Sequence, residues 1–106
     1  MKPSCNVATL IERYFTDRLM RQRNVSVNTV ASYRDTFRLL FVFAQARLRK
    51  LPSDLVLEDL DARFVSAFLD DIEKKRGAST RTRNLRLTAI RSFFRFVSFE
   101  LSLIHI

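Results

Sequence analysis

The clearest helical pattern in this chain lies in residues 26–48, SVNTVASYRDTFRLLFVFAQARL. Apolar residues recur there every three or four positions, which places them on one side of an α-helix. They are Val30, Tyr33, Phe37, Leu40, Phe41, Ala44 and Leu48. Ser26 stands where an N-cap is expected, and such a cap stabilises a helix by on the order of 1 kcal/mol. Pro52 follows soon after and cannot continue a helix. We therefore predict an amphipathic helix over residues 27–48.

A second helical pattern lies N-terminal to it, over about residues 9–21. Its apolar residues again recur at helical spacing. They are Ile11, Tyr14, Phe15, Leu19 and Met20. Thr9 and Glu12 have the spacing of a capping box, in which each side chain satisfies the free backbone N–H of the other residue. We therefore expect this helix to begin near Thr9.

Two more helices are predicted in the C-terminal half. The first, over about residues 61–76, begins with Asp61 and ends with three bases, as the helix dipole favours. Gly77, the only glycine of the chain, follows and suits the left-handed position after a helix. The second begins at Ser79 or Thr80 and extends at least to residue 99. Its broad apolar side consists of Leu85, Ala89, Ile90, Phe93, Phe94, Phe96, Val97 and Leu101.

Length and composition narrow the class of protein. A chain of 106 residues forms one domain, and one glycine with two prolines leaves too few turn residues for a β-sandwich or barrel. Cys5 is the only cysteine, so no intrachain disulfide or cysteine-based zinc site is expected. No apolar run approaches the roughly 20 residues of a membrane span, and no signal peptide is evident. We expect an all-α fold, a compact orthogonal bundle of four helices, in the cytoplasm and away from membranes.

Charge is distributed unevenly in this chain, whose formal net charge is +8. Residues 51–73 hold seven acids and one base, whereas residues 74–95 hold eight bases and no acid. A solvated helix surface usually mixes both signs, so the basic segment indicates a polyanionic partner such as nucleic acid. Fifteen of the bases are arginine, whose planar guanidinium pairs bidentately with phosphates and with base edges.

One side of the predicted C-terminal helix gathers polar and basic residues opposite most of its aromatic residues. At 100° per residue this side comprises Asn84, Thr88, Arg91 and Arg95, with Arg81 and Arg83 beside its N-terminal end. Arginine and asparagine can bond base edges in a major groove, and hydroxyl groups and helix N-termini can hold phosphates. A related side of the helix over residues 27–48 aligns Asn28, Ser32 and Asp35, with Arg34 and Arg38 beside them. The solvent-exposed side of any amphipathic helix has a similar composition, so both patterns are also compatible with helices that do not contact DNA.

Nothing in the sequence predicts an active site. His105 is the only histidine and stands in the tail, and a single glycine excludes a glycine-rich phosphate loop. We expect no catalytic residue, metal, cofactor or small-molecule substrate for this chain.

Three stretches carry a resemblance through their order and spacing. They are SVNTVASYRD (26–35) with FRLL (37–40), LEDLD (57–61) leading to FL (68–69), and STRTRNLRLTAIRSFFRF (79–96). Together they resemble the core-binding domain of tyrosine recombinases, the family of phage integrases and Xer-type recombinases. The resemblance covers about residues 7–101. It implies a SAM-like four-helix domain that forms half of a C-shaped clamp around duplex DNA, with its second and fourth helices at adjacent major grooves.

Residue by residue, the resemblance places eight side chains at or near DNA. They are Thr29, Ser32, Arg38, Arg81, Thr82, Asn84, Thr88 and Arg91. In this family a linker and a catalytic domain follow, and the latter cuts and rejoins DNA strands. We therefore expect residues 1–101 to be the core-binding domain and residues 102–106 to be a tail that is truncated or foreign. The chain is expected to bind DNA and to be inactive alone.

Two other classes of function remain open. One is a helical protein–protein interaction module, because the acidic segment 51–73 could contact a basic neighbour and recombinases of this family act as multimers on DNA. The other is a standalone helical regulator that binds DNA or RNA. The family resemblance favours duplex DNA and other recombinase protomers as partners, in the bacterial cytoplasm at the nucleoid.

Overall fold

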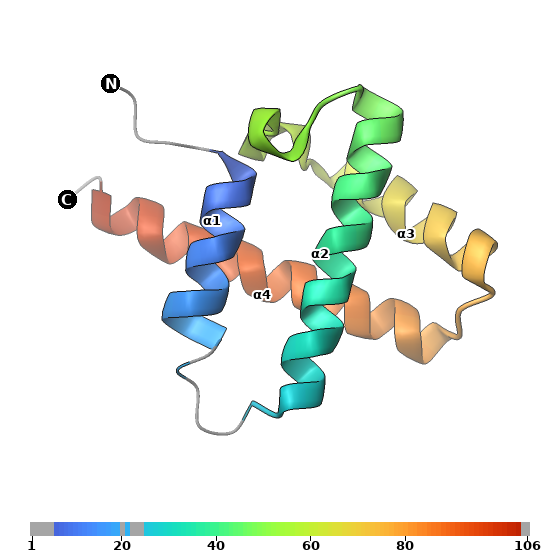
Figure 1. The fold of residues 1–106 in the computed structure, drawn as a ribbon, viewed down its shortest axis with the longest axis horizontal. Helices are drawn as coiled ribbons and strands as arrows, with labels where there is room; N and C mark the ends of the chain where they lie inside the picture. The colour runs from blue at the N-terminus through green and yellow to red at the C-terminus, as the bar shows by residue number, and fades with distance from the viewer. Residues whose placement is uncertain (1–5, 20, 22–24, 105–106) are drawn as a thin grey trace.

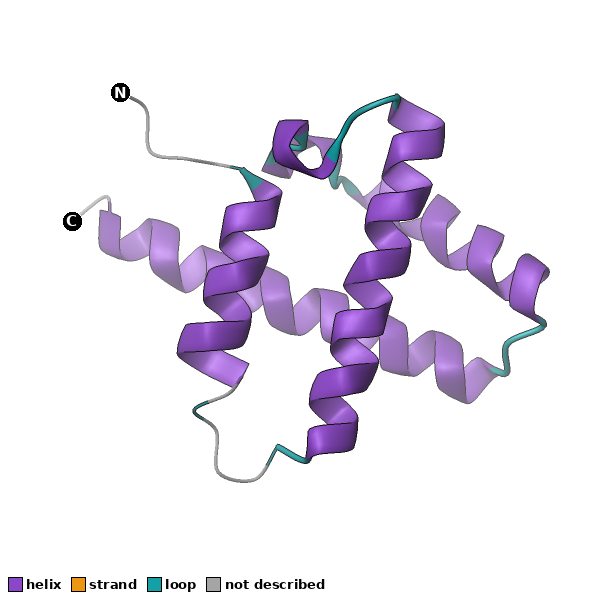
Figure 2. Cartoon of the chain, viewed as in Figure 1, coloured by secondary structure: helices purple, strands orange, loops and turns teal. Residues whose placement is uncertain are grey.

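The structure, a computed structural model, describes residues 6–19, 21 and 25–104, with side chains through Glu100. Within them lie four α-helices, α1 (Val7–Arg13), α2 (Val27–Leu48), α3 (Ala62–Arg76) and α4 (Thr80–Ile104). A π-helix, η1 (Tyr14–Leu19), continues α1, and two short 3-10 helices, η2 (Pro52–Asp54) and η3 (Leu57–Asp59), follow α2. The described residues form no strand, only a single bridge between Asn6 and Val56. The predicted all-α fold is confirmed (Figure 2).

The helices cross rather than run in parallel. α2 passes over α4, and the segment formed by α1 and η1 passes over the C-terminal half of α4 beside it (Figure 1). α3 and α4 form a hairpin closed by the turn at Gly77. None of the helices in the described part of the chain is long and apolar enough to span a membrane.

α2 has the predicted boundaries. Ser26 Oγ accepts a hydrogen bond from the backbone N–H of Thr29 at 3.0 Å, which is the expected N-cap. At the other end Arg49 takes a left-handed conformation (φ 58°), and its N–H donates to the Gln45 carbonyl. The helix therefore ends at Leu48, four residues before Pro52, which instead begins η2.

The N-terminal helix begins earlier than predicted, and the capping box of Thr9 and Glu12 is wrong. Asn6 is the N-cap: its side chain accepts from the backbone N–H of Thr9 at 3.0 Å, so Thr9 lies inside the first turn. Contacts with a distant part of the chain hold this start, because the N–H of Val7 donates to the Leu55 carbonyl. Met20 and the side chain of Leu101, both expected on apolar sides, lie outside the described residues.

The loop and turn after α2 are held by polar contacts. Lys50 Nζ bonds both carboxylate oxygens of Asp59, at 3.0 and 2.8 Å, and Asp59 also accepts from the N–H of Val56.

Asp61 caps α3 through the N–H of Phe64, and Gly77 adopts the predicted left-handed conformation with φ 60°. α4 begins at Thr80, as predicted, and continues to Ile104, into the segment expected as a tail.

The core is aromatic and centres on Tyr14. Its ring lies 5.4–6.3 Å from the rings of Phe15, Phe37, Phe93 and Phe96. The Tyr14 hydroxyl bonds Ser92 Oγ at 2.7 Å, which satisfies a polar group that the fold buries. Tyr14 thus joins the N-terminal segment to α2 and α4 as a core residue.

On α4 itself the expected apolar side is wrong at one position, because Leu85 is 40% exposed while Arg86 next to it is buried.

Candidate nucleic-acid interface

The predicted polar side of α4 lies on the surface. Asn84, Thr88, Arg91 and Arg95 are all exposed, and we call these four residues the outer stripe. The opposite side of the helix packs into the core through Ala89, Ile90, Phe93 and Val97. The outer stripe is therefore directed away from the rest of the bundle.

The arginines of α4 differ in how far they are engaged. Arg81, Arg91 and Arg95 are exposed and form no ion pair with any described residue. Arg83 Nη1, in contrast, bonds Glu73 Oε2 at 2.6 Å and Asp70 Oδ1 at 2.8 Å. These bonds, that to Glu73 first, raise the pKa of Arg83 above its ordinary value. Arg83 is thus bound to the acids of α3 in this structure.

Hydroxyl groups at the start of α4 and along it also have partners. Ser79 Oγ accepts a hydrogen bond from the backbone N–H of Thr82 at 3.2 Å, and it also contacts the Thr82 hydroxyl. Ser79 is thus the N-cap of α4. The Thr88 hydroxyl donates to the backbone carbonyl of Asn84 at 2.8 Å. Because its hydrogen is used in that bond, Thr88 Oγ1 faces the surface as an acceptor.

The predicted residues of α2 are fixed by local contacts. Thr29 Oγ1 lies 3.0 Å from Ser26 Oγ, and the half-buried Ser32 has its carbonyl bonded by the Thr36 hydroxyl. Arg38 Nη2 donates to Asp35 Oδ1 at 2.7 Å while its side chain remains 63% exposed. The guanidinium carbon of Arg34 lies 5.4 Å from the ring centroid of Phe15, within cation–π range.

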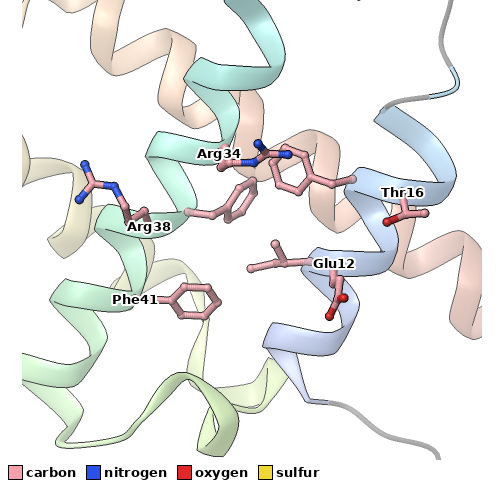
Figure 3. A pocket seen from close by; sticks show the side chains of 8 residues that line it. Glu12, Thr16, Arg34, Arg38 and Phe41 are labelled. Carbon is pink, nitrogen blue, oxygen red and sulfur yellow. The ribbon is translucent and has the colours of Figure 1, made fainter. Parts of the chain in front are cut away.

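Arg34 and Arg38 border a hollow between α2 and the segment formed by α1 and η1. Its volume is about 430 Å³, and Ile11, Phe15, Phe37 and Phe41 line it together with Glu12 and Thr16. Figure 3 shows the Arg34 guanidinium extending across α2 towards η1, whereas Arg38 points to the other side. The guanidinium groups of Arg34 and Arg38 therefore point in different directions and do not converge on a single binding position.

The pairing of Arg83 with α3 does not follow from the periodicity of α4, and the burial of Arg86 was not part of the predicted apolar side. The signal for the first is the short turn at Gly77, which brings the acids at the end of α3 beside the start of α4. The signal for the second is the periodicity itself: at 100° per residue Arg86 lies between Phe93 and Val97, in the middle of the buried side, whereas Leu85 lies at its margin. Among the described residues no group of three or more His, Cys, Asp or Glu side chains could hold a metal ion.

Comparison with known proteins agrees with this architecture. Residues 11–100 match the family model described as "Phage integrase, N-terminal SAM-like domain". The chain is 54% identical over 101 residues to the putative integrase/recombinase y4rC of Sinorhizobium fredii (strain NBRC 101917 / NGR234), which is 95% of this chain and 30% of that protein. Over 92 residues it is 54% identical to y4rD, a putative integrase/recombinase of the same strain, covering 87% of this chain and 33% of the relative.

A more distant relative carries a more specific name. The tyrosine recombinase XerC of Roseiflexus castenholzii (strain DSM 13941 / HLO8) is 33% identical over 84 residues, 79% of this chain and 25% of that protein. No solved structure matches the chain. The chain spans about a third of the length of these relatives or less. The match over residues 11–100 shows that the chain belongs to the family of phage integrase N-terminal SAM-like domains.

Proposed function

We propose that this chain is the DNA-binding domain of a site-specific tyrosine recombinase or integrase, and that α2 and α4 clamp duplex DNA. One observation carries the proposal: the exposed side of α4 presents Arg81, Arg91 and Arg95 without an ion-pair partner among the described residues. Neutralisation of phosphates by such groups supplies most of the non-specific affinity for DNA. A charge of +8 favours the same partner.

The outer stripe combines groups that can read bases. Asn84 and Arg91 stand seven residues apart, so they are about 10 Å apart along the helix axis, which is about three base pairs. Asparagine pairs bidentately with adenine and arginine with guanine in a major groove. Thr88 lies between them and, as an acceptor, suits an amino group of cytosine or adenine.

The residues of α2 suit contacts to the DNA backbone. Arg38 is held by Asp35 in an exposed position, and a phosphate can replace that carboxylate. Arg34 is oriented by the ring of Phe15, and Thr29 and Ser32 lie on the same helix. We assign Thr29, Ser32, Arg34 and Arg38 to positioning, and the outer stripe with Arg81, Thr82 and Arg83 to the groove.

The chemistry of recombination belongs to another part of the protein in this proposal. We assign residues 1–101 to DNA binding and no residue of this chain to the cutting or rejoining of strands. The partners are duplex DNA and other recombinase protomers on it, in the bacterial cytoplasm at the nucleoid.

Fluorescence anisotropy with a labelled random-sequence duplex tests the proposal over a series of salt concentrations. If about five phosphates are neutralised, log K falls against log salt with a slope near −4.5. Arg91→Ala and Arg95→Ala should each weaken binding and reduce the slope by about 0.9. Arg63→Ala, which removes an exposed arginine of α3, is the matched control.

Two results would contradict this function. One is an unchanged affinity in both outer-stripe variants, which would remove α4 from the interface. The other is a chain that sediments as a tight oligomer and does not bind duplex DNA, which would favour a protein–protein module.

A further inference from the structure

Leu85 is an apolar residue that α4 leaves in contact with solvent. It is 40% exposed, whereas Ala89 and Phe93 of the same helix are buried in the core. A leucine that stands alone on a protein surface is common and by itself indicates no function. The interest of Leu85 therefore depends on the residues that surround it.

Leu85 lies on one flank of the outer stripe, and Ser92 and Phe99 continue that flank at intervals of seven residues. Ser92 bonds the Tyr14 hydroxyl at 2.7 Å. The ring centroid of Phe99 lies 6.0 Å from the guanidinium carbon of Arg18. The segment η1 thus lies along this flank over the C-terminal half of α4, and Leu85 stands before it, at an exposed position of the N-terminal half.

The surface neighbours of Leu85 are polar or basic, and all of them belong to the candidate interface. Arg81 precedes it by four residues and Thr88 follows it by three, which are the spacings at which helical side chains meet. At 100° per residue the arc from Arg91 through Asn84 to Leu85 spans about 120°, less than half of the helix circumference. A helix in a groove can therefore present Leu85 together with the outer stripe.

The chemistry of a major groove offers a leucine one kind of contact. The base edges present hydrogen-bond donors and acceptors, which a leucine cannot use. The exception is the C5-methyl group of thymine, which apolar side chains contact. An exposed leucine among groups that suit phosphates and polar base edges thus matches thymine and no other base.

We propose that Leu85 contacts the C5-methyl group of a thymine and is a specificity-determining residue for A·T pairs in the DNA target. Leu85 follows Asn84 by about 1.5 Å along the helix axis, and a base pair rises about 3.4 Å, so both residues address the same pair or neighbouring pairs. Asn84 suits adenine, the partner base of thymine. The contact rests on the proposed DNA-binding function and adds a base preference that phosphate contacts do not supply.

Replacement of thymine by deoxyuridine tests the contact, because it removes only the C5-methyl group. Fluorescence anisotropy compares an A·T-rich duplex with the same duplex in which every thymine is deoxyuridine. The unmodified chain should bind the thymine duplex about fourfold more tightly, as expected for the burial of one methyl-sized group. Leu85→Ala should lose this difference at an unchanged salt slope, because no charge is removed. Leu85→Met, which stays apolar, should retain it.

Leu51→Ala is the matched control, at a leucine that is 55% exposed immediately before η2, and it should discriminate as the unmodified chain does. Thermal unfolding verifies that each variant is folded. Equal affinities of the unmodified chain for the two duplexes overturn the contact, as does a Leu85→Ala variant that still discriminates. If Arg91→Ala weakens binding while the unmodified chain does not discriminate, only this contact fails. If the chain binds neither duplex, the proposed function fails as well.

Discussion

The guanidinium of Arg83 and the carboxylate of Glu73 lie 2.6 Å apart, from Nη1 to Oε2, across the turn that joins α3 to α4. The same nitrogen is 2.8 Å from Asp70 Oδ1. These two acids link the end of α3 to the start of α4 near the surface, and they occupy an arginine that stands beside the outer stripe. If Arg83 contacts DNA as proposed, the acids of α3 and the phosphates compete for it.

Removal of one acid should release Arg83 to DNA. Glu73→Gln is expected to raise the affinity for a random-sequence duplex about threefold and to make the salt slope steeper by about 0.9. Thermal stability should change little, because the pair is near the surface. Asp71→Asn is the matched control, since Asp71 pairs with Lys75 on the same helix. Equal gains in both variants would attribute the effect to net charge alone.

Asp59 should make the stability of the chain sensitive to acid. Burial by itself raises the pKa of Asp59, but hydrogen bonds from Lys50 and from the N–H of Val56 outweigh it and hold the pKa below its ordinary value. A lowered pKa in the folded state contributes stability above the ordinary value of about 4, and that contribution is lost as the pH falls below it.

Urea denaturation checks this expectation. Asp59→Asn should lower the free energy of unfolding by about 1 kcal/mol near neutral pH, and the difference from the unmodified chain should shrink below about pH 4. Asp54→Asn, at an exposed acid of η2, serves as the control. A difference that stays constant down to about pH 3 would show that the carboxylate is not the group that titrates.

Tyr14→Phe should destabilise the fold by about 1 kcal/mol, because Ser92 loses its buried partner. Burial of Tyr14 raises its pKa, although the bond to Ser92 opposes the shift. The neutral hydroxyl therefore contributes stability below the ordinary value of about 10, and the contribution is lost at higher pH. Chemical denaturation at neutral and alkaline pH should show the cost of the substitution disappearing above about pH 10. Tyr33→Phe, whose hydroxyl has no hydrogen bond with any described residue, should not show this loss of stability at neutral pH.

Gly77 and Arg49 both adopt a left-handed backbone conformation, and they should respond in opposite ways to substitution. Gly77 has φ 60°, and a Cβ atom there meets nothing within 4 Å, so Gly77→Ala should cost only the backbone strain, about 1 kcal/mol. Arg49 adopts φ 58° with a side chain, so Arg49→Gly should be neutral or stabilising by a few tenths of a kcal/mol. Thermal unfolding of both variants compares them, and a loss of stability in Arg49→Gly would show that its side chain matters more than its backbone.

Local signals predicted α2 and the ends of α3 because Ser26, Asp61 and Gly77 act on their own neighbours in sequence. The start of α1 was not predictable in this way. Asn6 and Thr9 are both acceptable caps, and the bond from Val7 to Leu55, far along the chain, supports a start at Asn6. Local sequence rules are therefore reliable where a residue contacts only its neighbours in the sequence.

In the candidate site, too, local sequence predicts some features, whereas contacts between helices determine others. Periodicity alone places Asn84, Thr88, Arg91 and Arg95 on the surface, as the structure has them. It also places Arg86 between Phe93 and Val97 on the buried side, but it does not reveal that Arg83 is bound by acids of α3. That contact depends on how α3 meets α4, which is a tertiary property.

The bond between Tyr14 and Ser92 also governs when the domain can form during synthesis. These residues are 78 positions apart, and the ring of Tyr14 packs against Phe93 and Phe96 of the same late helix. At about 5–20 residues per second, a ribosome needs roughly 4–16 s to pass from one partner to the other. During that interval the earliest helix can pack on Phe37 of α2 but not on α4, so the domain completes its fold only when its last helix has left the ribosome.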